Sequence, residues 1–228
     1  MSAGGEPLAA AALQRLHAPA VLAGRLTIEE RWGRPWLAYN VFIRADPAGA
    51  AVLSAAQEPI LALEPGLRRM PADAMHITVI FMLPGASEFE EPKDELWRRH
   101  GSRWLAQLGQ ITAELPRFRL QFRHLVATDA AIIAVADEPN QISALRRAAV
   151  AALDVPGRTQ VNALVHTTLF RYASPLRDPA ELLRYLAGAD AAAELDVAEL
   201  LVARERTFPF FAYDVLQSLP LAPTSLAS

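Results

Sequence analysis

The fold is decided by one stretch of sequence and its later copy: AMHITVIFM at residues 74–82 and ALVHTTLFRY at residues 163–172. Both stretches are rich in β-branched and aromatic residues and are followed by turn-forming residues, so each predicts a β-strand. Side chains alternate between the two faces of a strand, which places His76 beside Thr78 and His166 beside Thr168. If the two pairs face one another, they surround one anion with an acid, a base and two hydroxyl donors.

These two segments, HITV from His76 and HTTL from His166, resemble the paired His-x-Thr/Ser-x motifs of the 2H phosphoesterase superfamily. That superfamily includes the bacterial RNA 2′,3′-cyclic phosphodiesterases historically called 2′-5′ RNA ligases. The first motif runs into an apolar–Phe–apolar segment and a Gly turn, and the second continues His-x-Thr-Leu-x-Arg to Arg171, as in the family. One departure is Val165, where the RNA phosphodiesterase branch commonly has Pro. The similarity covers about residues 36–218.

The resemblance implies an α+β fold of two pseudo-symmetric lobes, with antiparallel sheets around a central groove and helices outside. The order of predicted elements, strand–helix–strand twice over, independently indicates two similar lobes that each give one motif strand to the groove. Strands are predicted at residues 36–44, 67–70, 75–82, 118–126, 131–136, 161–172, 198–206 and 212–219. Helices are predicted at residues 8–17, 47–56 (ending near Pro59), 93–115, 141–153 and 179–186.

We therefore expect one bilobal catalytic domain over residues 35–220, a partly helical or frayed N-terminal extension over 1–34, and a C-terminal tail over 221–228. The chain has no cysteine, which excludes a disulfide framework and a thiol nucleophile. No window reaches the roughly 18 uninterrupted apolar residues of a membrane span. No basic segment precedes the Ala-rich N-terminus, so we expect a cytoplasmic monomer with no membrane partner.

The net charge of −3 bears on the substrate. Proteins that bind long nucleic acids neutralise many phosphates and are usually strongly basic. This balance favours a small phosphate ester, such as a nucleotide or an RNA end that carries a cyclic phosphate. The motifs do not separate an RNA end, a cyclic mononucleotide, a 2′,5′-oligonucleotide and a cyclic ADP-ribose phosphate. Phe81, Tyr172 and Trp36 are candidates for groove walls, although aromatics are more often core residues.

Two histidines can open a 2′,3′-cyclic phosphate without a metal or cofactor. His76 and His166 would act as acid and base, because an imidazole titrates near neutral pH. Thr78 and Thr168 would donate hydrogen bonds to the non-bridging phosphate oxygens. Arg171 is a candidate substrate-binding residue, but strict alternation puts it on the opposite strand face unless a bulge re-aims it. A solvated charge at the strand end explains it equally well.

Rival interpretations have weaker support. A zinc site lacks a third ligand at suitable spacing and an HExxH motif, and a serine hydrolase lacks a G-x-S-x-G elbow. A non-catalytic module that binds a nucleotide or RNA end stays open, and turnover of a cyclic nucleotide without added metal would distinguish it. The other histidines, His17, His100 and His124, have no such motif around them and favour solvated or structural roles.

Overall fold

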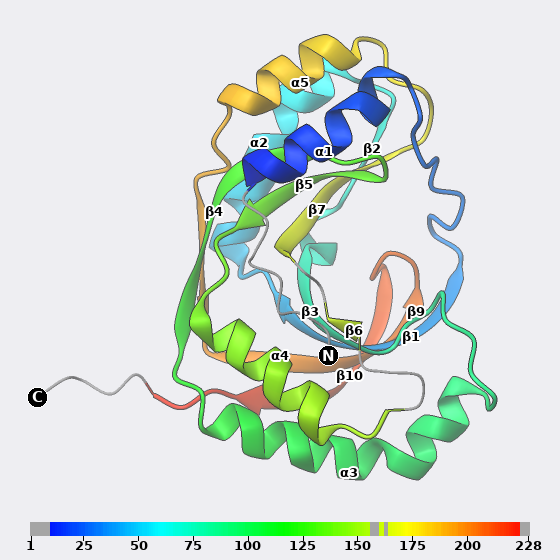
Figure 1. Cartoon of the computed structure of the whole chain (residues 1–228), viewed down its shortest axis with the longest axis vertical. Helices are drawn as coiled ribbons and strands as arrows, with labels where there is room; N and C mark the ends of the chain where they lie inside the picture. Colours follow the sequence, from blue (N-terminus) through cyan, green and yellow to red (C-terminus); the bar gives the residue numbers. More distant parts are fainter. Residues whose placement is uncertain (1–9, 156–159, 162–163, 224–228) are drawn as a thin grey trace, which may run out of the picture.

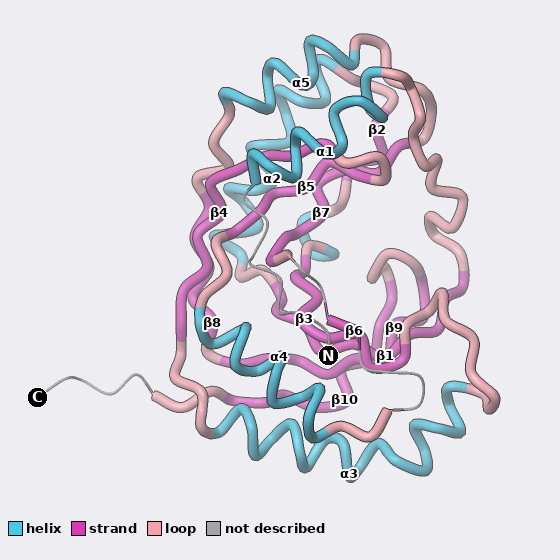
Figure 2. Tube along the Cα trace, viewed as in Figure 1, coloured by secondary structure: helices cyan, strands magenta, loops and turns pink. Residues whose placement is uncertain are grey.

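The computed structural model describes residues 10–155, 160–161 and 164–223. This part of the chain forms two five-stranded sheets in which every strand pair is antiparallel, with helices around them (Figures 1 and 2). The predicted α+β fold of two lobes is therefore confirmed. Residues 1–9 of the expected N-terminal extension, residues 224–228 of the expected tail and residues 162–163 of the strand predicted at 161–172 lie outside the described residues.

Lobe 1 consists of the sheet β10-β9-β1-β3-β6 and the helices α3 and α4, which occupy the lower half of Figure 1. Its strands are β1 Pro35–Arg44, β3 His76–Leu83, β6 Gln160–Val161, β9 Glu199–Thr207 and β10 Ala212–Pro220. Its helices are α3 Lys93–Ala113 and α4 Asn140–Ala152. The sheet carries the first motif on β3.

Lobe 2 consists of the sheet β2-β7-β5-β4-β8 and the helices α1, α2 and α5. Its strands are β2 Leu67–Arg69, β4 Phe118–Ala127, β5 Ala131–Ala136, β7 Val165–Tyr172 and β8 Ala193–Val197. Its helices are α1 Ala10–Leu22, α2 Pro47–Leu63 and α5 Pro179–Gly188, and the short 3-10 helix η1 Ala72–Ala74 leads into β3. The second motif lies on β7.

The two lobes exchange an edge strand. β2 precedes β3 in the chain but pairs with β7, whereas β6 precedes β7 but pairs with β3. The buried core is continuous through this exchange, because Ile77 and Val79 of β3 belong to the same apolar cluster as Leu169 and Phe170 of β7. Both motif strands are therefore anchored from behind by one core.

Several sequence predictions differ from the structure. The helix predicted at residues 8–17 continues to Leu22. The helix predicted to end near Pro59 continues to Leu63, because Pro59 lies on the exposed side and the next turn buries Ile60. The strand predicted at residues 161–172 is two strands, since β6 and β7 belong to different sheets. Strand β8 was not predicted, although its buried and exposed residues alternate.

The N-terminal segment packs on the groove side of lobe 2. Leu13 of α1 joins a cluster with Ile133 and Val135 of β5. These two β5 residues pair with Thr168 and His166, and directly paired residues share a sheet face. Helix α1 thus covers part of the face that carries the second motif. The expected boundary at residue 34 stays a prediction.

None of the helices in the described ranges has both the length and the apolar character that crossing a bilayer requires. The longest helix, α3, carries acidic residues in its first turn and several charged residues along its length. Its buried side consists of Leu96, Trp104 and Leu108, which pack into the main core. It is an amphipathic helix of the lobe 1 surface.

Candidate active site

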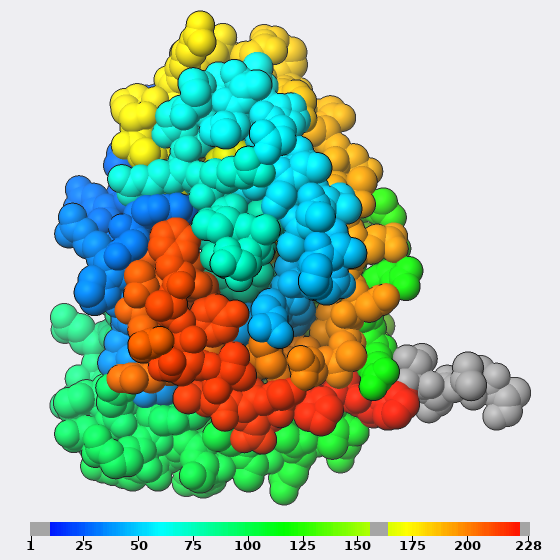
Figure 3. Space-filling model, turned by 180° about the vertical axis from the view of Figure 1, so that it is seen from behind, coloured from blue at the N-terminus to red at the C-terminus, as the bar shows by residue number. Residues whose placement is uncertain are grey.

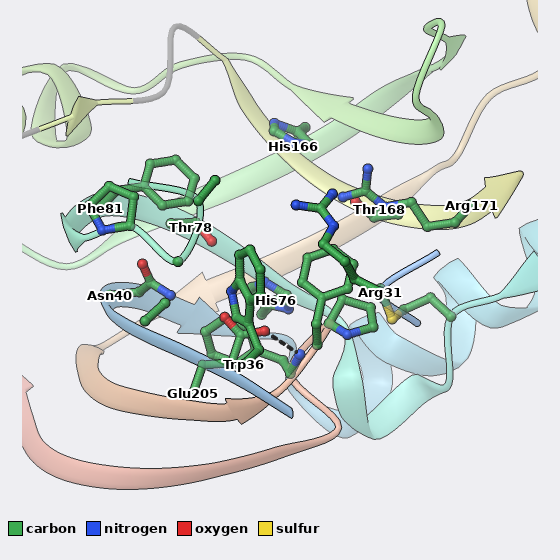
Figure 4. A pocket seen from close by; sticks show the side chains of 18 residues that line it. Arg31, Trp36, Asn40, His76, Thr78, Phe81, His166, Thr168, Arg171 and Glu205 are labelled. Carbon is green, nitrogen blue, oxygen red and sulfur yellow. Dashed lines mark hydrogen bonds between the residues drawn. The ribbon is translucent and has the colours of Figure 1, made fainter. Parts of the chain in front are cut away.

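One cavity of about 280 Å³ lies between the lobes and collects the side chains of both motifs (Figure 4). His76 and Thr78 enter it from β3, and His166 and Thr168 enter it from β7. The residues between them, Ile77 and Thr167, are buried on the opposite strand face. The volume is just below the usual range for small-molecule sites, which is roughly 300–1,000 Å³.

A bulge in each motif strand brings a third side chain into the cavity. One extra residue, Val79, interrupts the pairing of β3 with β1, and Leu169 does the same where β7 pairs with β5. Each extra residue reverses the alternation that follows, so Phe81 and Arg171 turn to the face of their motif histidines. Both line the cavity (Figure 4). From the sequence, we expected Arg171 to reach the site only if a bulge re-aimed it. The bulge in β7 does so.

A backbone carbonyl orients the imidazole ring of His76. His76 Nδ1 lies 2.8 Å from the carbonyl oxygen of Ala74, two residues earlier in the chain. His166 has Leu164 at the same offset, and the Leu164 carbonyl raises the pKa of the imidazole, but His166 Nδ1 is buried without a hydrogen-bond partner in the described part of the chain. For His76, hydrogen bonding at Nδ1 leaves Nε2 as the nitrogen that can exchange a proton with a ligand.

Burial makes both imidazoles weak bases in the unliganded protein. It lowers the pKa of His76 to about 4, and the positive charge of Arg171 contributes in the same direction. Burial also lowers the pKa of His166 to about 4, together with the charges of Arg171 and His76. Because the charge of His76 lowers the pKa of His166, the two rings interact electrostatically across the cavity. A bound anion would favour their protonation.

A turn between β9 and β10 holds His76 from the other side. The ring of Phe210 stacks on the imidazole with a centroid distance of 3.8 Å and an interplanar angle of 28°. Phe210 has a φ of 60°, which a bulky residue rarely adopts. Its N–H donates to Oε1 of the buried Glu205 at 2.8 Å. Glu205 therefore fixes a strained turn whose aromatic residue supports the first motif histidine.

Sequence reasoning missed several groups that line the cavity, namely Arg31, Asn40, Glu205, Phe208 and Phe210. Asn40 offered a local signal, because it is a polar residue within the apolar strand β1 and is buried. The others come from segments whose position follows only from the tertiary fold. Of the expected aromatic walls, Trp36 and Phe81 line the cavity. The prediction that Tyr172 forms a wall of the groove is wrong, because Tyr172 is buried and its hydroxyl donates to the Thr128 carbonyl.

The other three histidines lie outside this cavity. His17 contacts Asp129 at 3.2 Å, His100 lies against Trp104 in α3, and His124 is exposed on β4. Within the described ranges, no three acidic or histidine side chains are grouped in a way that suits a metal ion. The cavity instead presents two imidazoles, two hydroxyls and two guanidinium groups, a set that suits a phosphate group.

The sequence matches no protein-family model and no curated protein. Several solved structures share the fold. TT0787 of Thermus thermophilus is 20% identical with a TM-score of 0.60, over 82% of this chain and 98% of that one. E. coli LigT complexed with 3′-AMP is 16% identical with a TM-score of 0.52, over 83% and 99%. A structure described as a phosphoesterase is 14% identical with a TM-score of 0.52, over 82% and 99%. This chain therefore has the fold of the 2H phosphoesterases.

Proposed function

We propose that the protein is a metal-independent phosphoesterase that hydrolyses a cyclic or 2′-linked nucleotide phosphate, most simply a nucleotide or RNA 2′,3′-cyclic phosphate. The observation that carries the proposal is the meeting of both His-x-Thr pairs and Arg171 in one cavity. Two separate strands, each with a bulge after its motif, supply a His at position i, a Thr at i+2 and a third cavity residue at i+5, which is Phe81 on β3 and Arg171 on β7. Chance burial of single histidines does not explain such a repeat.

In the proposed reaction, a neutral imidazole takes a proton from water as the water oxygen attacks phosphorus. The bond from phosphorus to one ribose oxygen breaks, and the second imidazole, in its protonated form, gives that oxygen a proton. Thr78 and Thr168 donate hydrogen bonds to the non-bridging oxygens, where negative charge accumulates. Arg171 adds a positive charge that already acts on both imidazoles in the unliganded protein. The product is a ribose phosphate monoester with one free hydroxyl.

Replacing His76 or His166 with Ala tests this function. Each replacement removes one proton-transfer group, so kcat should fall by roughly 10²–10⁴ while the fold is retained. The measurement is release of product from a 2′,3′-cyclic nucleotide with and without EDTA. His124→Ala is a matched control, because His124 is exposed on β4 outside the cavity.

A substrate panel completes the test. It comprises a 2′,3′-cyclic mononucleotide, a short RNA with a cyclic end, a 2′,5′-oligonucleotide and a cyclic ADP-ribose phosphate. Turnover of any of these that survives in the His76→Ala/His166→Ala double variant, or that EDTA abolishes, contradicts the mechanism. Tight binding of a cyclic nucleotide without turnover would show the non-catalytic binding module instead.

A further inference from the structure

The segment between α1 and β1 brings a second arginine to the cavity. Residues 27–29 attach to lobe 2, where the Thr27 N–H donates to Asp129 and the Glu29 N–H donates to Tyr172. Four residues later, the segment attaches to the β9–β10 turn of lobe 1. The Gly33 N–H donates to the Phe208 carbonyl, and the Phe208 N–H donates to the Arg34 carbonyl. Arg31 lies between these anchors and lines the cavity (Figure 4). The segment thus closes one end of the site.

The guanidinium group of Arg31 is held in one orientation. Its Nε and Nη2 donate to the two carboxylate oxygens of Glu29 at 2.7 and 2.8 Å, and Glu29 is only 3% exposed. The rings of Trp36 and Phe208 flank the group, with centroids 5.1 and 4.7 Å from its central carbon. Its third nitrogen, Nη1, donates to no described residue. A fixed arginine with a free donor is suited to bind an oxyanion.

Arg31 and Arg171 form a cationic pair over one aromatic ring. The guanidinium of Arg171 lies 5.7 Å from the centroid of Phe208, which also contacts Arg31. Burial lowers the pKa of Arg171 and the charge of Arg31 lowers it further, although Glu29 opposes this. Arg171 Nε is buried without a hydrogen-bond partner in the described part of the chain. Two like charges that contact the same ring, each with an unused donor, favour a bound anion.

A second and larger cavity, of about 1250 Å³, does not offer a comparable site. It lies beside the start of α2 and the β9–β10 hairpin, which Figure 3 shows in blue to cyan and in orange to red. Its charged lining residues are Asp46, Asp73, Asp196 and Glu199, with Arg44 and Arg117 as the basic ones. The acidic excess disfavours a phosphate chain there. The Arg31 end of the catalytic cavity is the favourable direction for further negative charge.

We propose that Arg31 binds a second phosphate of the substrate, the one on the 5′ oxygen of the ribose whose cyclic phosphate the histidines hold. This inference rests on the proposed function. The 5′ oxygen is the position at which a nucleotide within a chain, or in a dinucleotide, carries its next phosphate. The substrate class is therefore a nucleotide with phosphates at both ends of its ribose, in preference to a cyclic nucleoside monophosphate with a free 5′ hydroxyl.

Binding measured by calorimetry tests the inference without requiring turnover. The probes are adenosine 3′-monophosphate and adenosine 3′,5′-bisphosphate. Because a hydrogen bond to a charged group adds appreciably to affinity, the wild-type protein should bind the bisphosphate about tenfold or more tightly. In Arg31→Gln the ratio of the two affinities should fall to near one. Arg34→Gln, which removes an exposed charge from the same segment, should keep the wild-type ratio.

Arg31→Gln leaves the buried Glu29 without its ion-pair partner, which could destabilise the fold. The double variant Glu29→Gln/Arg31→Gln removes both charges and should show the same ratio near one. Equal affinity of the wild-type protein for the two probes would overturn the inference, as would an equal loss for both probes in the arginine variants. If the protein shows the bisphosphate preference but no turnover of cyclic phosphates, the proposed function fails and the second phosphate site stands.

Discussion

At the scale of single residues, Glu205 is a buried ionisable group whose role is to hold the β9–β10 turn in place beside His76. Burial raises the pKa of Glu205 to about 7, against the opposing effects of the Phe210 N–H and the charge of Arg31. A Leu at this position would avoid the free-energy cost of desolvating a carboxylate, but it would leave the Phe210 N–H without its acceptor. Because Phe210 stacks on His76, the carboxyl is a positioning group for the first motif.

Replacing Glu205 with Gln should change stability in a pH-dependent manner. The folded pKa is above that of an unfolded Glu, so wild-type stability is greatest below the unfolded pKa and decreases as pH rises through 7. Gln keeps an oxygen for the Phe210 N–H and never ionises. Urea unfolding should therefore give similar stabilities at pH 4.5 and a more stable variant at pH 8, by up to about 3 kcal/mol.

Glu199→Gln, which changes an exposed carboxyl on the same strand, controls for the loss of one charge. A Glu205→Gln protein that is less stable than wild type at pH 8 would mean that the carboxylate is stabilised by the fold, contrary to this account.

At the scale of elements, the sequence predicted most of the strands and helices, but it did not locate the bulges in the motif strands. The patterns around His76 and His166 specify strands because β-branched and apolar residues surround them. Nothing in those patterns marks Val79 or Leu169 as extra residues, since a bulge depends on the partner strand. The consequence is functional, because the bulge in β7 decides whether Arg171 faces the buried core, on the side of Thr167, or the cavity.

Arg146 of α4 joins the two motif strands from behind the site. It pairs with Glu138 at 3.0 Å, and it donates to the carbonyls of Val79 in β3 and Leu164 just before β7, both at 3.2 Å. Its side chain is only 7% exposed. Removing one partner of a buried pair leaves the other charge uncompensated, which costs about 3–5 kcal/mol.

Arg146→Met should therefore lower the free energy of unfolding by about 3–5 kcal/mol, measured by urea denaturation. Arg147→Met is the matched control, because Arg147 is exposed on the neighbouring position of the same helix and should change stability by less than about 0.5 kcal/mol. A similar small effect for both variants would show that the bridge between the motif strands is not needed for stability.

At the scale of the whole molecule, the site is a product of two lobes and of a segment that lies outside the family resemblance. The sequence predicted the four motif residues because each motif is local. It missed Arg31 because residues 26–34 show no motif, and their position follows from backbone contacts with Tyr172 and Phe208, which are remote in sequence. It missed Glu205 for the same reason, since only the folded hairpin brings this carboxyl to the cavity.

Enclosure between the lobes also sets the pH dependence that we predict for the reaction. With both imidazoles near a pKa of about 4, the fraction of free protein that carries a protonated histidine at pH 7 is small. A bound phosphate raises the pKa of each histidine by its negative charge. Because kcat/KM reports the free protein and kcat reports the complex, the alkaline limb of kcat/KM should lie at least about one pH unit below that of kcat.

Arg171→Gln supplies the control for this prediction, because the charge of Arg171 adds to burial in lowering both histidine pKa values. Its removal should move the alkaline limb of kcat/KM to higher pH, in addition to raising KM through the loss of a phosphate contact. The measurement is the pH–rate profile of a cyclic nucleotide for wild type and variant between pH 4 and 9. Coincident profiles of kcat and kcat/KM with a common optimum above pH 7 would contradict the view that the groove holds both histidines neutral until the substrate binds.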